Sequence, residues 1–204
     1  MPRYGSGQRD HEGFSFLELT IVLGIGLVIT AIGVPRVNTF IANAKVRASM
    51  TTVSGFFQSV RMLAIKNNGS MTARYFNRPV MPFSLVYYAK AAADTSTTPT
   101  TSDSQAELEA PITAYNTPTG TGAPPAITNT ALGLSADPQT GDPSFNSRGL
   151  PCAYSFGSGS CLNAAFIKYF RDNRIGSSGG WAAISVTPAG RIKRWFWNGS
   201  SWTD

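Results

Sequence analysis

A single carboxylate lies inside the longest apolar run of the chain. Residues 14–34 contain one charged residue, Glu18. At roughly 1.5 Å of rise per residue, a helix of this length crosses a hydrocarbon core of ~30 Å. A charge in the middle of a bilayer costs about 2.5 to 3.5 kcal/mol, so an ionisable residue there predicts a function and a partner. The alternative is that Glu18, near the start of the run, lies at the membrane interface and costs little.

Histidine chemistry is nearly excluded by composition. The only histidine, His11, precedes the apolar run and lies in a segment that we expect to be removed by processing. A Ser-His-Asp triad, a Cys-His pair and the usual zinc sites all need an imidazole in the folded part. The sequence therefore predicts no catalytic residues, no metal site and no cofactor, and an anchored hydrolase is disfavoured.

The two cysteines suit a structural role better than a metal site. Cys152 and Cys161 are nine positions apart, and two thiols are too few for a Cys-rich metal site. Their spacing favours a loop-closing disulfide formed in an oxidising compartment. Two free buried thiols are the alternative.

Charge is unevenly distributed along the chain, whose formal net charge is +6. Residues 1–90 carry ten Lys and Arg against three acids, residues 91–151 carry one against six, and residues 152–204 carry six against two. Such asymmetry indicates an anionic partner, nucleic acid or lipid, although a solvated basic face is the more common explanation.

The N-terminal elements divide into a leader and a membrane helix. Residues 1–13 are polar and form no packed element, so we interpret them as a leader peptide. Residues 14–35 form the membrane-spanning or filament-core helix. Its glycines and Pro35 weaken it, which predicts a bend or local melting at Pro35. The small residues equally permit close helix approach in lipid.

Residues 36–68 are predicted to continue this helix as an amphipathic segment that ends at the Asn-Asn-Gly of 67–69. Its apolar side chains recur at intervals of three and four, which predicts one face packed on a domain. They are Val37, Phe40, Ile41, Ala44, Ala48, Val53, Phe56, Phe57, Val60, Leu63 and Ala64.

Two β-rich regions flank a segment of different composition. Residues 69–90 read as the first strands of a head, and residues 145–204 as its β-rich C-terminal part, with a hairpin turn at "TPAGR". Residues 91–144 hold seven of the thirteen prolines with abundant Thr, Ser and Gly. That composition does not build a core, so we expect a long, partly disordered insertion or surface loop with short structure near "QAELEA". Glycosylation of this tract is an alternative role.

The stretch "EGFSFLELTIVLGIG" resembles the processing site of type IV prepilins and type II secretion pseudopilins. In that family a prepilin peptidase cuts after the Gly and methylates the new N-terminal Phe. The resemblance implies cleavage after Gly13, N-methylation of Phe14, and a Pro at the family's customary place, Pro35. It also implies that Glu18, fifth in the mature chain, pairs with the N-terminal amine of a neighbouring subunit during filament assembly. A buried carboxylate is tolerated when it is paired in this way.

"SVRMLAIKNN" and "PSFNSRGLPC" further resemble the GspH/FimT group of minor pilins and pseudopilins. The resemblance covers both ends of the chain and not residues 91–144. It implies an α+β fold in which a long N-terminal helix, membrane-spanning in its first half, packs on a C-terminal antiparallel β-sheet head. It also implies a structural subunit of a type IV pilus or type II secretion system. Such a subunit resides in the inner membrane as a single-pass protein with a periplasmic head, and then joins other pilins in a filament.

A basic turn near the C-terminus supports a second function. Family members that bind DNA for natural transformation carry a GRxR motif, which "GRIKRW" resembles in its first two positions, Gly190 and Arg191, while Lys193 replaces the last Arg. Arg191, Lys193 and Arg194 could engage phosphates, with Trp195 and Trp197 stacking on bases. The alternatives are a solvated strand edge and tryptophans that belong to the core. DNA uptake is therefore the runner-up function, with Lys168, Arg171 and Arg174 as further candidate contacts.

Overall fold

The computed structural model describes residues 15–78, 84–108, 111–175 and 180–204. The chain divides into two units, Met1–Asn38 and Thr39–Asp204. Helix α1, Phe16–Lys66, contains residues of both units. Within the described residues it is the helix long and apolar enough to cross a membrane by length and composition.

Helix α1 ends where the sequence predicts and continues through the proline. The amides of Asn67 and Gly69 donate to the carbonyls of Leu63 and Ala64, and Asn68 adopts a positive φ of 46°, which closes the last turn. Pro35 lies within the helical assignment. The bend expected at Pro35 stays a prediction.

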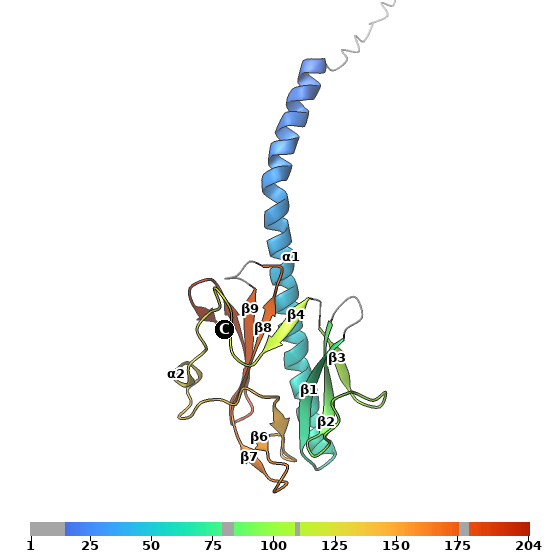
Figure 1. Cartoon of the computed structure of the whole chain (residues 1–204), viewed down its shortest axis with the longest axis vertical. Coiled ribbons are helices and arrows are strands. Elements are labelled where there is room, and N and C mark those ends of the chain that lie inside the picture. Colours follow the sequence, from blue (N-terminus) through green and yellow to red (C-terminus); the bar gives the residue numbers. More distant parts are fainter. Residues whose placement is uncertain (1–14, 79–83, 109–110, 176–179) are drawn as a thin grey trace, which may run out of the picture. The chain divides into compact units, whose positions relative to one another are not determined.

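The strands of the second unit form two antiparallel sheets (Figure 1). The six-stranded sheet has the order β3-β2-β1-β5-β6-β7, and the five-stranded sheet has the order β11-β10-β9-β8-β4. The strands of the first sheet are β1 Met71–Arg78, β2 Ser84–Ala91, β3 Gln105–Glu107, β5 Ser144–Phe145, β6 Pro151–Tyr154 and β7 Cys161–Asn163. Those of the second are β4 Ile112–Tyr115, β8 Phe166–Asp172, β9 Trp181–Val186, β10 Ile192–Trp197 and β11 Trp202–Thr203.

This architecture confirms the α+β class and changes the expected number of sheets. The strands expected in residues 69–90 and 145–204 are present, and β9 and β10 form the predicted hairpin. The head was expected to hold one sheet, whereas the described strands form two. The sequence pattern of a strand is local, but its pairing with another strand depends on residues far away in the sequence, as for Ala114 of β4 and Phe170 of β8. A period-2 pattern alone therefore does not assign strands to sheets.

The main core lies between the C-terminal part of α1 and both sheets. Val53, Phe57 and Val60 of α1 are at most 1% exposed and pack with residues such as Tyr87 and Phe170. The second half of the predicted apolar face is thus confirmed, and the first half is wrong. Its expected members are exposed, and the buried positions there are Ala42, Val46, Ser49 and Met50.

A second cluster covers the outer face of the five-stranded sheet. It joins Tyr169, Trp181 and Trp195 to Ile127, which comes from the segment between β4 and β5. The Ile127 amide donates to the Tyr169 hydroxyl at 2.9 Å, and the Trp202 indole donates to the Pro125 carbonyl at 2.8 Å. The short helix α2, Asn129–Leu132, lies in the same segment. Residues 116–138 therefore cover a sheet face.

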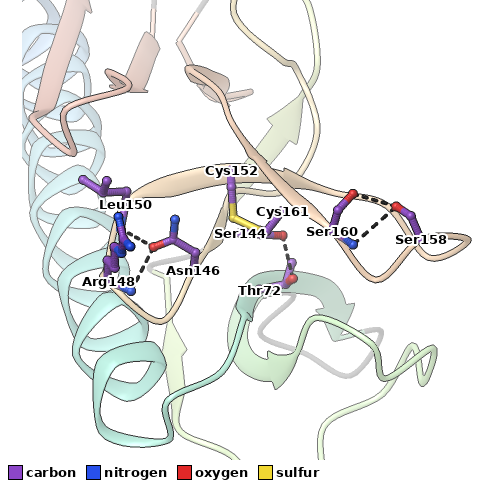
Figure 2. Close-up of a disulfide and its surroundings, with 9 residues drawn as sticks. All are labelled: Thr72, Ser144, Asn146, Arg148, Leu150, Cys152, Ser158, Ser160 and Cys161. Atoms are coloured by element: carbon purple, nitrogen blue, oxygen red, sulfur yellow. Dashed lines mark hydrogen bonds between the residues drawn. A yellow bond between two sulfur atoms is a disulfide. The ribbon is translucent and has the colours of Figure 1, made fainter.

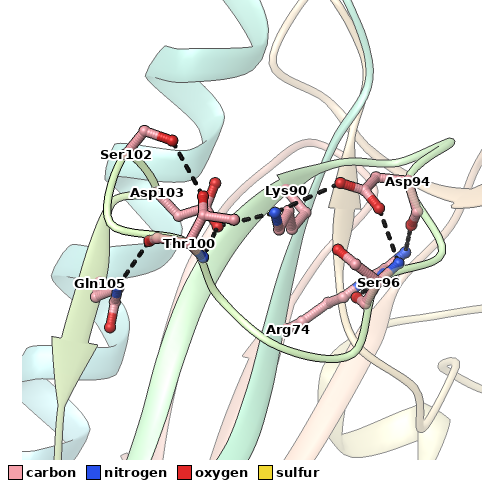
Figure 3. A network of polar contacts seen from close by, with 8 residues as sticks. All are labelled: Arg74, Lys90, Asp94, Ser96, Thr100, Ser102, Asp103 and Gln105. Atoms are coloured by element: carbon pink, nitrogen blue, oxygen red, sulfur yellow. Dashed lines mark hydrogen bonds and ion pairs between the residues drawn. The ribbon is translucent and has the colours of Figure 1, made fainter.

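Residues 92–104, between β2 and β3, are fixed by one buried lysine (Figure 3). Lys90 is 7% exposed, and its Nζ atom lies 2.9 Å from the Asp103 carboxylate and 3.5 Å from that of Asp94. Arg74 of β1 donates to the carbonyls of Asp94 and of Ser96. Leu108 and Ile112, which follow this loop, join the main core. Core residues in the Thr- and Pro-rich segment were not expected from its composition. The structure shows that a few well-spaced apolar residues suffice to anchor a polar segment to the core.

Candidate functional site

The N-terminal part of α1 carries the residues for which the sequence predicts assembly. Gly13 and Phe14 lie outside the described residues. Glu18 lies in the first turn of α1, and its neighbours Leu17 and Leu19 are 68% and 52% exposed. An acidic residue in a first turn is also favoured by the helix dipole.

Polar groups within the apolar part of α1 are satisfied locally, with one exception. The hydroxyl of Thr20 donates to the Leu17 carbonyl at 2.8 Å, and that of Thr30 donates to the Gly26 carbonyl at 2.7 Å. Glu18 forms no ion pair with any residue that the structure describes. In lipid or in a helix bundle, its carboxylate is thus the group that needs an external partner.

The predicted basic turn is a tight hairpin. The Gly190 amide donates to the Thr187 carbonyl at 2.7 Å, and the Thr187 amide donates to the Arg191 carbonyl at 2.9 Å. Gly190 has a φ of 80°, which L-residues rarely adopt. Arg191 is exposed on this turn.

The three predicted cations do not converge. Lys193 pairs with Asp204 at 2.9 Å and lies over the Trp195 ring, 5.0 Å from its centroid. Arg194 donates instead to the Thr51 hydroxyl of α1 at 2.9 Å. Successive side chains of a strand point to opposite faces, so Lys193 and Arg194 lie on different faces of β10. A single phosphate site made of all three cations is therefore excluded by the strand geometry.

The tryptophans and further cations of this region are engaged in the fold. Trp195 is 7% exposed, and its indole donates to the Ser185 hydroxyl at 2.9 Å. Trp197 is partly buried and packs against the second cluster, so the alternative of a core tryptophan is confirmed for Trp195. Lys168 is 3% exposed, and Arg174 forms a 2.6 Å ion pair with Asp172. Lys168 is thus too buried to contact nucleic acid.

A different arginine, which the sequence reasoning missed, lies at the base of the turn. A Cβ atom built on Gly190 would lie 3.2 Å from Arg61 Nη1, and one built on Gly149 would lie 2.9 Å from Arg61 Cγ. Arg61 therefore packs against two turns, and each turn carries an exposed arginine beside its glycine, Arg148 and Arg191. The sequence signal for this arrangement is that Arg61 directly follows the core residue Val60. The chain also contains an Arg-Gly pair at 148–149 and a Gly-Arg pair at 190–191.

The predicted disulfide is present between neighbouring strands (Figure 2). Cys152 of β6 and Cys161 of β7 have Cα atoms 5.1 Å apart, and Cys152 is fully buried. The preceding turn is fixed by the Asn146 side chain, which accepts from the amides of Arg148 and Leu150 at 3.0 Å each. Two free thiols, the alternative, are excluded.

Among the residues that the structure describes, no group of three or more His, Cys, Asp or Glu is arranged to hold a metal ion. Comparisons with family models, with curated proteins and with solved structures found no match to this chain.

Proposed function

We propose that this chain is a structural, non-catalytic subunit of a type IV pilus or a type II secretion system, a minor pilin or pseudopilin of the GspH/FimT group. A prepilin peptidase cleaves it after Gly13 and methylates Phe14. The mature chain resides in the inner membrane with a periplasmic head and then enters a filament with other pilins. The observation that carries the proposal is Glu18, the one charged residue of the apolar run 14–34, which begins directly after Gly13.

Two features of the structure support this proposal. The apolar side chains of α1 up to Val34 are largely exposed, as expected of a segment whose partners are lipid or other helices. The disulfide is consistent with a head that folds in an oxidising compartment such as the periplasm.

The first experiment examines processing. The full chain is expressed with an active prepilin peptidase, and its N-terminus is determined by mass spectrometry. The expected product begins with N-methylated Phe14. An intact Met1 N-terminus under these conditions would contradict the proposal.

The second experiment examines assembly through Glu18. The Glu18→Ala chain is expected to be inserted and cleaved normally, because removing a charge from lipid is favourable. Its recovery in the sheared filament fraction should fall at least about tenfold, because the amine of a neighbouring subunit loses its partner. Asp137→Ala, which removes an exposed carboxylate from the second unit, is the matched control and should assemble like the wild type. Equal recovery of the wild type, Glu18→Ala and Asp137→Ala in the filament fraction would contradict the proposed role of Glu18 in assembly.

A second candidate function, DNA binding, is favoured by Arg61 between two arginine-bearing turns. In the full chain in detergent, Arg148→Gln/Arg191→Gln should lower the slope of log affinity for duplex DNA against log salt by about 0.9 per lost phosphate contact. Both residues are exposed, so the fold should be retained. Lys193→Gln, which removes a cation paired with Asp204, should leave the slope nearly unchanged. No binding by the wild-type chain at low salt would exclude this function.

A further inference from the structure

A buried lysine in the main core has an unusual set of contacts. Lys168 of β8 is 3% exposed and lies between Phe166 and Phe170 on the core side of the strand. Its Nζ atom donates to Asn116 Oδ1 at 2.7 Å, lies 3.5 Å from Asp142 Oδ1, and lies 4.4 Å from the centroid of the Tyr75 ring. A buried ammonium is costly unless it is paired, so these groups determine the chemistry of Lys168.

Strand register brings the asparagine to the lysine. Strands β4 and β8 pair antiparallel up to Tyr115 and Tyr169, and the next step of the same register places Asn116 opposite Lys168. Asn116 directly follows β4, so the pairing that ends at Tyr115 brings its amide to the side of Lys168. The Asn116 carbonyl carbon is bonded directly to the oxygen that Nζ already contacts. Proximity of two groups within one fold is part of what makes an intramolecular reaction fast.

The carboxyl group completes the arrangement. The ion pair of Asp142 with Lys168 is long at 3.5 Å, and Asp142 Oδ1 accepts no hydrogen bond from any residue that the structure describes. Burial raises the pKa of Asp142 above its ordinary value, although Lys168 and Arg74 oppose the shift. A carboxyl group that is readily protonated beside an amine and an amide can carry protons between them.

We propose that Lys168 and Asn116 become joined by an amide bond between Lys168 Nζ and Asn116 Cγ, with Asp142 as the proton carrier. This is a self-catalysed modification site that links β4 to β8 through their side chains. It is independent of the proposed function, since it concerns only residues of the second unit.

The reaction balances without any added reagent. A proton passes from the Lys168 ammonium to the Asp142 carboxylate, which leaves both groups neutral. The Nζ lone pair then forms a bond to Cγ, and the carbonyl electron pair moves onto Oδ1, which the Asp142 carboxyl group stabilises by donating a hydrogen bond. Asp142 gives its proton to Nδ2 and takes one from Nζ. The Cγ–Nδ2 bond breaks and ammonia leaves, with a direct route to solvent because Asn116 is exposed.

The experiment is peptide mapping of the full chain, purified in detergent, reduced and digested with trypsin. Trypsin cannot cut after an acylated lysine, so the linked chain should yield one species that joins residues 91–148 to residues 149–171. Its mass should be that of the two peptides less one ammonia, and tandem fragmentation should locate the link at Asn116 and Lys168.

The wild-type chain decides the outcome, whatever the variants do to folding. Recovery of peptide 149–168 at full yield, with no joined species, would overturn the proposal. Loss of ammonia at Asn116 alone, as a cyclic imide without a joined peptide, would also overturn it.

Three variants assign the roles. Asn116→Ala, a truncation at an exposed position, should abolish the link. Asp142→Asn should slow its formation about 100-fold, measured as the linked fraction against time after synthesis. Lys90→Arg, which alters a different buried lysine paired with two carboxylates, should leave the link intact. Full linkage in Asp142→Asn would overturn the role of Asp142.

Discussion

Gly149 and Gly133 share a left-handed backbone but differ in their surroundings. Their φ angles are 72° and 68°. A Cβ atom on Gly149 would lie 2.8 Å from Ile65 Cδ1, whereas nothing lies within 4 Å of one on Gly133. The same chemical change at the two positions therefore separates backbone strain from crowding.

Gly133→Ala should destabilise the second unit by the backbone term alone, about 1 to 2 kcal/mol. Gly149→Ala should add roughly 1 to 3 kcal/mol, because Ile65 and Arg61 must move. Chemical unfolding followed by tryptophan fluorescence measures both values. Equal losses would show that α1 accommodates a methyl group there and that Arg61 is loosely held.

At the scale of an element, the loop between β2 and β3 depends on charges at both of its ends. Hydrogen bonds from Ser96 lower the pKa of Asp94. Burial alone would raise the pKa of Asp103, but hydrogen bonds from Thr100 and Lys90 outweigh it and lower the pKa. The hydrogen bond to Asp103 raises the pKa of Lys90. At a pH above their unfolded pKa values, the carboxylates of Asp94 and Asp103 therefore contribute their full stabilisation to the loop. This stabilisation is lost as the pH falls through their lower, folded-state pKa values. Lys90 contributes fully below its own unfolded pKa.

Acidification below about pH 4 should therefore release residues 92–104 before the rest of the second unit. Hydrogen exchange, corrected for the pH dependence of intrinsic rates, should show faster exchange in this loop while β1 remains protected. In Asp103→Asn the loop should exchange faster already at neutral pH, with a weaker acid response. The loop at 155–160, closed by the disulfide, is the internal reference and should not respond. Loss of protection in β1 at the same pH would mean that the loop is not a separate unit of stability.

At the scale of the whole second unit, α1 gives both sheets one common core. Phe57 packs edge to face with Tyr87 of the first sheet, with ring centroids 5.6 Å apart, and Tyr87 also contacts Phe170 of the second sheet at 6.3 Å. The two sheets are thus coupled through the same aromatic side chains. We expect them to unfold in one cooperative transition.

Phe57→Ala should destabilise this unit by about 3 to 5 kcal/mol, because it leaves a cavity in the shared core. The loss should appear equally in near-ultraviolet circular dichroism and in hydrogen exchange of β2 and β9. Phe40→Ala is the matched control, since Phe40 is 74% exposed, and it should change stability by less than about 0.5 kcal/mol. Two separate transitions in Phe57→Ala would show that the sheets are stable independently.

Local signals predicted the elements better than the contacts between them. The end of α1 at Asn67–Gly69, the hairpin at Gly190 and the disulfide followed from turn residues and short spacings. The N-terminal half of the amphipathic face did not, because alanine, serine and valine occur on both sides of α1 there. The packing of Arg61 against the Gly190 turn was also missed, since Arg61 lies far from that turn in the sequence and meets it at a glycine, as it meets a second turn at Gly149.

The cover formed by residues 116–138 sets an order for folding. During synthesis α1, β1 and β2 are complete while β4 still lacks its neighbour β8, which begins at Phe166. The cover reaches its final contacts later still, because the Pro125 carbonyl accepts a hydrogen bond from the indole of Trp202, near the end of the chain. Until that residue arrives, the second cluster, which contains Ile127 and Trp181, lacks one of its final neighbours, and the nascent chain must avoid aggregation through this apolar surface. A polar, proline-rich cover suits this delay, since it forms no competing strand while it waits.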